Sequence, residues 1–470
     1  MEAITNKAEA QTGGRLTVRK ASILLLLSSL VVLGLTAGKN ALVRHATETS
    51  AADLSAQPAS CRLVLAPQPV DKPIDQEIAQ QQAIVLKTSA PSRALERLGW
   101  TFVKKARLSF DEGFYKLAEQ CAACLEAHGS KGPDTLLLRA HALQSLHRFD
   151  EAEATARELI NLRQLPFDYG VLGDILIDQG KVREGAAAYQ KMVDLRPDLQ
   201  SYARAAHVRW LTGDLNGAIE LMTLATTSSG PNDPEAAAWA FTRLALYRLQ
   251  RGATKQALES SEAALSLQSD YAPSMLARSR ILLAMNRSAD ALVELQRAVK
   301  LNPLPEYQWA LADAFTVAGD RKRAAEIESQ IAGRADTEDP RTISLYLATR
   351  NQDVERAVRL AQQELTKRGD VFTHDALAWA LAAAGRTLEA QKHAKQALSE
   401  GTPDPRLYLH AGVIAALNND NRQARRLLDQ AAATQQMLLP SERVQLENWR
   451  QKVGRKSTNQ PALTTRKTKQ

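Results

Sequence analysis

The residues best suited to chemistry in this chain are two cysteines and a histidine within one short segment. Cys121 and Cys124 form a Cys-Ala-Ala-Cys motif, and His128 follows four residues later. The spacing is that of a dithiol redox pair, but such a pair needs a strand followed by a helix. This segment is expected to be helical throughout, where a disulfide between residues three apart would be strained. The motif therefore predicts no redox centre.

The same residues could offer zinc two sulfur atoms and an imidazole from one helical face. A structural zinc site needs a fourth ligand, and no second Cys/His pair completes one. Haem attachment needs a histidine directly after the second cysteine, where Leu125 stands. We therefore expect structural thiols, with no metal and no cofactor. The alternative, open if the protein is exported, is a disulfide from Cys61 to one of the pair.

No other pattern in the sequence indicates catalysis. The 8 histidines are scattered, and His147 occupies a turn position. The sequence contains no HExxH motif, no glycine-rich phosphate loop, no dinucleotide fingerprint and no Ser/His/Asp grouping. We expect a protein that is not an enzyme.

The elements that carry these residues recur every 33 or 34 residues, with one longer gap. A small residue marks each period: Ala118, Ala152, Gly185, Ala218, Ala257, Ala291, Ala324, Ala357, Ala390 and Ala424. Five positions earlier stands a turn former or a tolerant substitute: Gly113, His147, Gly180, Gly213, Gly252, Asn286, Gly319, Gln352, Gly385 and Asn419. This spacing predicts a tight turn between two helices, which cross closely because the marked residue is small.

The pattern resembles the tetratricopeptide repeat (TPR), a helix–turn–helix unit of 34 residues. The resemblance implies an all-α, right-handed superhelical solenoid. Ten units are expected over residues 91–438, starting at residues 99, 133, 166, 199, 238, 272, 305, 338, 371 and 405. Stacked units need a cover at their ends, and residues 439–454 predict a C-terminal capping helix with Ser441 as its N-cap.

Two places depart from the repeat pattern. Leu345 stands at a small-residue position and Glu364 at an apolar one, both in the eighth unit. We therefore expect irregular contacts between this unit and its neighbours. Residues 233–237 are an insertion, for which we expect a longer loop or an extended helix start.

The resemblance also implies where a partner binds, because the first helices of TPR units line a concave groove. The candidate partner-binding residues on these helices are Arg107, His141, His207, Trp210, Arg280, Trp309, Tyr346 and Trp379. Aromatic residues and arginine often anchor interfaces; the alternative is that several of these side chains pack against the neighbouring unit. TPR proteins that bind chaperone C-terminal tails use asparagine on these helices. No sixth or ninth position is asparagine here, so no chaperone C-terminal tail is expected.

The two ends of the chain differ from the repeats. Residues 1–20 are a basic segment, and residues 21–38 form an uncharged apolar run just long enough to span a bilayer. We interpret the run as a transmembrane signal anchor or a signal peptide. Residues 39–90 predict a flexible linker and residues 455–470 a disordered basic tail. These features predict a location at the cell envelope. The protein would be membrane-anchored through one span with its repeats on the non-cytoplasmic side, or exported.

Charge and composition narrow the classes of partner. The net charge is +8, but residues 1–44 carry +4 and residues 452–470 carry +6, so the repeats are close to neutral. Nucleic-acid binding is therefore not expected. The sequence favours a non-enzymatic scaffold that binds an unknown protein or peptide in its concave groove. The alternative is a structural subunit of a membrane-associated enzyme or transport complex.

Overall fold

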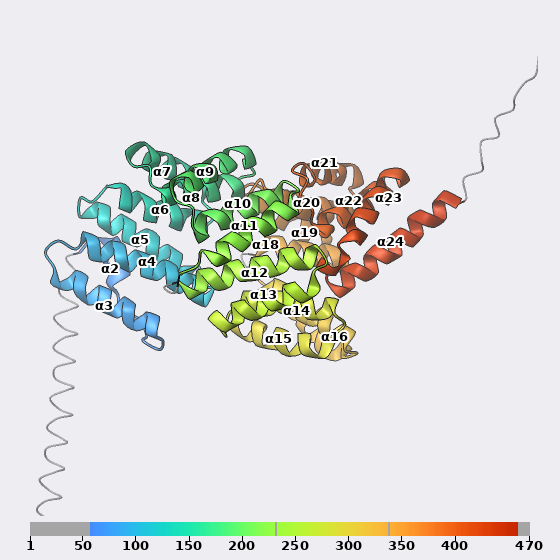
Figure 1. Cartoon of the computed structure of the whole chain (residues 1–470), viewed down its shortest axis with the longest axis horizontal. Coiled ribbons are helices and arrows are strands. Elements are labelled where there is room, and N and C mark those ends of the chain that lie inside the picture. Colours follow the sequence, from blue (N-terminus) through green and yellow to red (C-terminus); the bar gives the residue numbers. More distant parts are fainter. Residues whose placement is uncertain (1–56, 231–232, 337–338, 459–470) are drawn as a thin grey trace, which may run out of the picture. The chain divides into compact units, whose positions relative to one another are not determined.

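The computed structural model describes residues 57–230, 233–336 and 339–458, and every element in these ranges is a helix. The chain divides into two units, Met1–Pro69 and Val70–Gln470. The described part of the first unit is residues 57–69, which contain helix α2 (Ala59–Leu65). Helix α3 and all later helices belong to the second unit (Figure 1).

Ten antiparallel helix pairs make up most of the second unit, which has a TPR-like fold (Figure 1). The first helices of the pairs are α4 (Ser92–Ser109), α6 (Pro133–Ser145), α8 (Pro166–Asp178), α10 (Leu199–Leu211), α12 (Pro234–Gln250), α14 (Ala272–Ala284), α16 (Pro305–Val317), α18 (Pro340–Arg350), α20 (Val371–Ala383) and α22 (Pro405–Leu417). The second helices are α5 (Gly113–Ala127), α7 (Phe149–Leu162), α9 (Val182–Leu195), α11 (Leu215–Thr227), α13 (Thr254–Leu267), α15 (Ser288–Leu301), α17 (Arg321–Ala332), α19 (Val354–Leu365), α21 (Thr387–Ala397) and α23 (Asn421–Ala433).

The two recurring positions of the sequence have the structural roles that their residue types predict. The alanines are buried where paired helices cross, and a Cβ added to Gly185 would lie 2.8 Å from Ile177. Eight of the ten turn residues have positive φ, including His147 at 58°. In the first unit the left-handed turn residue is Phe110, and in the eighth unit Asn351 and Asp353 both have positive φ.

The eighth unit is irregular, as its sequence predicts. Its first helix, α18, makes few contacts with α17 but packs extensively against α20. Glu364 is buried, and burial raises the pKa of its carboxyl group. The insertion at residues 233–237 extends a helix: α12 begins at Pro234, and the Asp233 side chain accepts a hydrogen bond from the Ala236 amide at 3.1 Å.

The described ends of the chain contain more helix than the sequence predicts. Helix α3 (Pro73–Lys87) and α2 both lie in the segment interpreted as a linker, and apolar side chains of α3 are buried. The C-terminal helix α24 (Pro440–Thr458) ends beyond residue 454. Ser441 lies inside its first turn and is not the N-cap; the Glu442 carboxylate instead accepts a hydrogen bond from the Leu439 amide at 2.8 Å.

The expected membrane segment, residues 21–38, lies outside the described residues. Within the described ranges, no helix combines the length and the apolar character that crossing a bilayer requires.

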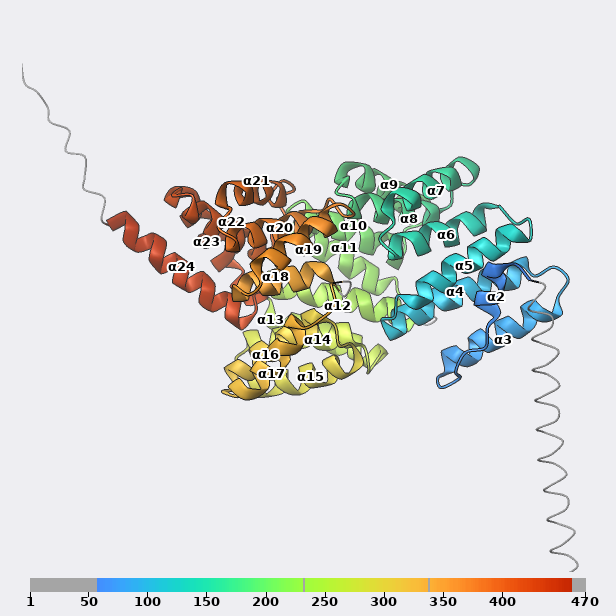
Figure 2. The same ribbon diagram turned by 180° about the vertical axis from the view of Figure 1, so that it is seen from behind.

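Helices far apart in the sequence touch each other within the second unit, and we call these links between distant repeats the closure contacts. Arg368 pairs with Asp178, and the Thr402 hydroxyl donates a hydrogen bond to the Leu211 carbonyl at 2.7 Å. Seen from behind in Figure 2, α20 lies beside α10. A Cβ added to Gly180 would lie 2.3 Å from the Gly369 carbonyl oxygen, so the turns that hold these two glycines approach closely.

A second group of closure contacts involves the C-terminal helices. Gln436, in the short 3-10 helix η1 (Gln435–Met437), donates to the carbonyl oxygen of Leu249 at 3.1 Å. The Ser441 amide donates to the Asp313 carboxylate at 2.8 Å. Hydrogen bonds and ion pairs therefore join repeats of the solenoid that are several units apart.

Candidate peptide-binding groove

The first helices of the N-terminal half surround an open cavity of about 450 Å³, which we call the concave groove. It lies between α4, α8, α10 and α12. Its walls are formed by Arg107, Asp174, Tyr189, Leu199, Gln200, Ala203, Arg204, His207, Glu235, Ala236, Trp239 and Arg243. These described lining residues include no serine, threonine or cysteine that could act as a nucleophile. The charged residues of the lining are three arginines and two carboxylates.

Two ion pairs hold most of the charged side chains of the groove in place. Arg204 forms a bidentate pair with Asp174, with N···O distances of 2.9 and 2.7 Å. The Tyr189 hydroxyl donates to the same carboxylate at 2.7 Å. Arg107 pairs with Glu235 at 3.2 Å. Burial raises the pKa of Glu235. These four charges compensate each other within the groove.

Arg243 is the exception among the groove's cations. Its guanidinium lies 5.7 Å from the Trp210 ring centroid and 5.2 Å from that of Tyr247. Among the described residues, no carboxylate lies within ion-pairing distance of it. Burial, with Arg243 nearby, lowers the pKa of His207 to about 4, so this imidazole is neutral at physiological pH and adds no charge.

Trp239 stands one turn before this arginine on α12, lines the same groove and is 39% exposed. A large aromatic side chain that is open to solvent on a concave surface is a typical anchor for a partner. The groove thus offers one uncompensated cation and one exposed aromatic ring to a ligand.

Of the eight candidate residues, Arg107 and His207 line this groove. His141 lies on α6 between aromatic rings, with its centroid 5.4 Å from that of Trp100 and 6.4 Å from that of Phe167. Arg280 on α14 pairs with Glu306 at 2.6 Å.

Trp210 takes part in the closure contacts and does not lie on an open surface. It is buried, and its ring stacks on Phe372 from α20 at a centroid distance of 5.9 Å. Its indole nitrogen donates to the Gln250 side chain at 2.8 Å.

The other aromatic candidates are also buried. Trp309 is 2% exposed, meets Tyr346 edge-on at 5.5 Å, and has the Arg406 guanidinium 5.5 Å from its ring centroid. Trp379 stacks on His410 at 4.2 Å. Tyr346 and His410 lie in the units next to those of Trp309 and Trp379, so these rings pack mainly against neighbouring units.

Trp239 and Arg243, which provide the exposed ring and the unpaired cation of the groove, were not among the candidates. They stand at the second and sixth positions of the fifth unit, whereas the candidates came from the fifth, ninth and twelfth positions. The signal was present: arginine occupies the sixth position in two consecutive units, at Arg204 and Arg243.

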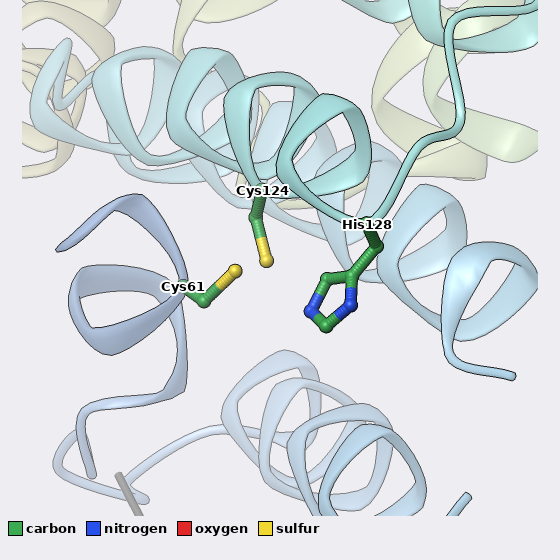
Figure 3. A group of neighbouring side chains, drawn as sticks. All are labelled: Cys61, Cys124 and His128. Atoms are coloured by element: carbon green, nitrogen blue, oxygen red, sulfur yellow. The ribbon is translucent and has the colours of Figure 1, made fainter. Parts of the chain in front are cut away.

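Two of the three cysteines are not the free thiols that were expected. Cys121 is a buried free thiol whose pKa is raised by burial, as expected for a structural cysteine. Cys61 and Cys124, drawn with His128 in Figure 3, are each disulfide-bonded. Cys124 therefore has no thiolate to offer a metal, and it does not form a dithiol pair with Cys121.

Comparison with known proteins adds only distant likenesses. No family model and no curated protein sequence matches the chain. A solved structure of Pseudomonas aeruginosa PilF is 16% identical, covers 42% of this chain and 90% of its own, and has a TM-score of 0.37. The human IFIT1 dimer with PPP-AAAA is 12% identical, covers 82% of this chain and 99% of its own, and has a TM-score of 0.45. A tetratricopeptide repeat protein from Parabacteroides merdae is 15% identical, covers 55% and 98%, and has a TM-score of 0.31.

Proposed function

We propose that this chain is a non-enzymatic scaffold that binds a segment of another protein in the concave groove. The observation that carries the proposal is the juxtaposition of Arg243, which has no carboxylate partner among the described residues, with the exposed indole of Trp239. Both side chains project from α12 into a groove whose remaining charges are paired. A bound segment would supply an acidic side chain for the arginine and an apolar one for the indole.

We further propose that binding takes place at the cell envelope. The support for this location is the apolar run at residues 21–38, which follows a basic segment. Intact mass of the native protein tests it: removal of about the first forty residues indicates a cleaved signal peptide, and the full mass together with membrane fractionation indicates an anchor. A full-length protein found only in the soluble fraction would contradict both alternatives.

The groove is tested by pull-down from solubilised membranes with the full chain and with Arg243→Gln/Trp239→Ala. The matched control is Arg251→Gln, which removes an exposed arginine directly after the same helix. We expect the double variant to lose partner bands that the wild type and the control retain. Identical bands from all three proteins would remove the groove as the binding surface.

A further inference from the structure

A second groove lies at the other end of the repeat array, between α21 and α23, with α22 as its floor. It encloses about 990 Å³. Figure 1 shows α21, α22 and α23 side by side near the C-terminal end of the repeats. No residue of this groove lines the concave groove. It is therefore a separate surface.

The walls of the α21–α23 groove run along the helix axes. On α21 the lining residues begin at Leu388 and recur through Lys392 and Lys395, which is the spacing of one helical face. The opposite wall begins at Asp420, the N-cap of α23, and continues through Gln423 and Arg426 in the same way. With a rise of 1.5 Å per residue, the α21 wall is about 15 Å long, or about three helical turns.

The groove combines an apolar interior with a cationic rim. Its floor contains Ile414 and Ala415, and Leu388 is 72% exposed, the most of any large apolar residue among the described positions. Exposed apolar surface of this kind marks an interaction site when polar residues surround it.

The rim is cationic because three of its side chains lack acidic partners. Among the residues that the structure describes, no carboxylate pairs with Lys392, Lys395 or Arg426, whereas many other arginines of the second unit form ion pairs. The one acidic lining residue, Asp420, already caps α23 by accepting a hydrogen bond from the Gln423 amide at 2.9 Å. The groove therefore has a surplus of positive charge.

We propose that this groove binds a short, acidic, amphipathic α-helix of a partner protein. The helix places apolar side chains against Leu388 and the α22 floor, and carboxylates beside the lysines of α21 and Arg426 of α23. An extended segment fits less well, because the backbone groups of the helical walls are already hydrogen-bonded and would leave those of the segment without partners. A helix satisfies its own backbone bonds.

The test uses the full chain in detergent and a fluorescein-labelled helical peptide with leucines on one face and glutamates flanking them. A second peptide carries glutamine in place of every glutamate. We expect the glutamate peptide to bind about tenfold more tightly than the glutamine peptide, because three exposed ion pairs together contribute about that factor. The advantage should shrink as salt is raised.

Two variants test whether the peptide binds in this groove. Each has a control substitution on the second helix of a different repeat. Lys392→Glu/Lys395→Glu should remove the preference for glutamate, whereas Lys191→Glu, an exposed position on α9, should preserve it. Leu388→Asn should weaken both peptides, whereas Leu162→Asn, another exposed leucine, should weaken neither. Equal binding of the two peptides, the absence of binding, or unchanged binding in the groove variants would each overturn the proposal.

Discussion

Arg368 pairs with Asp178, a carboxylate 190 positions earlier in the chain. Both side chains are largely shielded from solvent, and Arg368 also reaches Asp370 at 3.2 Å. Burial raises the pKa of Asp178, while the arginine counteracts that shift. The pair joins the last residue of α8 to the segment before α20 and is an electrostatic link among the closure contacts.

We expect Arg368→Met to lower the free energy of unfolding by about 3 kcal/mol, because it leaves Asp178 buried without its cation. Asp178→Asn/Arg368→Met should recover part of that loss, since neither charge remains. Arg386→Met, which breaks an exposed pair with Glu389, serves as the control and should cause no measurable change. Urea denaturation measures all three. A loss no larger than that of the control would mean that the pair does not stabilise the closure.

Stability should depend on pH through His141. Burial lowers the pKa of this residue in the folded chain from 6.5 to about 4, and its Nδ1 has no hydrogen-bond partner among the described residues. Between these two values the unfolded chain takes up a proton that the folded chain does not, so the folded state loses stability as pH falls from 6.5 toward 4. At about pH 5 this loss is about 2 kcal/mol.

His141→Phe should remove this contribution while keeping an aromatic ring between Trp100 and Phe167. Relative to the wild type, the variant should gain about 2 kcal/mol more at pH 5 than at pH 7.5, as measured by denaturant titration at both values. Parallel pH profiles for the two proteins would argue against a buried neutral imidazole.

Glycine at the crossing of α8 and α9 is required for close packing. A Cβ added to Gly173 would lie 2.3 Å from the ring of Tyr189, whose hydroxyl is hydrogen-bonded to Asp174. Gly173→Ala should therefore destabilise the fold by about 1–3 kcal/mol. Gly454→Ala, in α24 where nothing lies within 4 Å of the new Cβ, should instead stabilise by up to about 1 kcal/mol through helix propensity. Thermal unfolding distinguishes the signs, and stabilisation by both substitutions would contradict the packing argument.

Two tryptophans should behave in opposite ways. Trp309→Ala should cost about 3–5 kcal/mol of stability, because the side chain is fully packed. Trp239→Ala should cost less stability than Trp309→Ala, because Trp239 is 39% exposed, yet it should lose the partner bound in the concave groove. Denaturation and pull-down on the same preparations separate the effects. Loss of partner from a folded Trp309→Ala protein, with Trp239→Ala unaffected, would reverse the assignment of the groove.

The sequence is most informative where contacts are local. Ala118 and its equivalents, with turn residues such as His147, predict ten helix pairs because both positions act within one pair. The departures at Leu345 and Glu364 likewise locate the irregular eighth unit, because each residue can be compared with the residues at the same position of the other repeats.

The sequence is least informative where contacts join distant repeats. Nothing in the types of Gly180, Gly369 or Thr402 indicates that they meet residues on another turn of the solenoid. Because Trp210 faces α20 across that closure, a position expected to be open is buried. Trp239 remains exposed since α12 borders the open part of the concave surface.

The closure contacts also change how the array should unfold. In an open solenoid each repeat touches only its neighbours, so terminal repeats can fray one after another at little cost to the rest. Here the release of α20 breaks bonds to α8 and α10, and the release of η1 breaks bonds to α12. Partly frayed states therefore lose contacts at two distant places in the chain at once. The second unit should consequently unfold with the cooperativity of a globular domain rather than as a row of separable repeats.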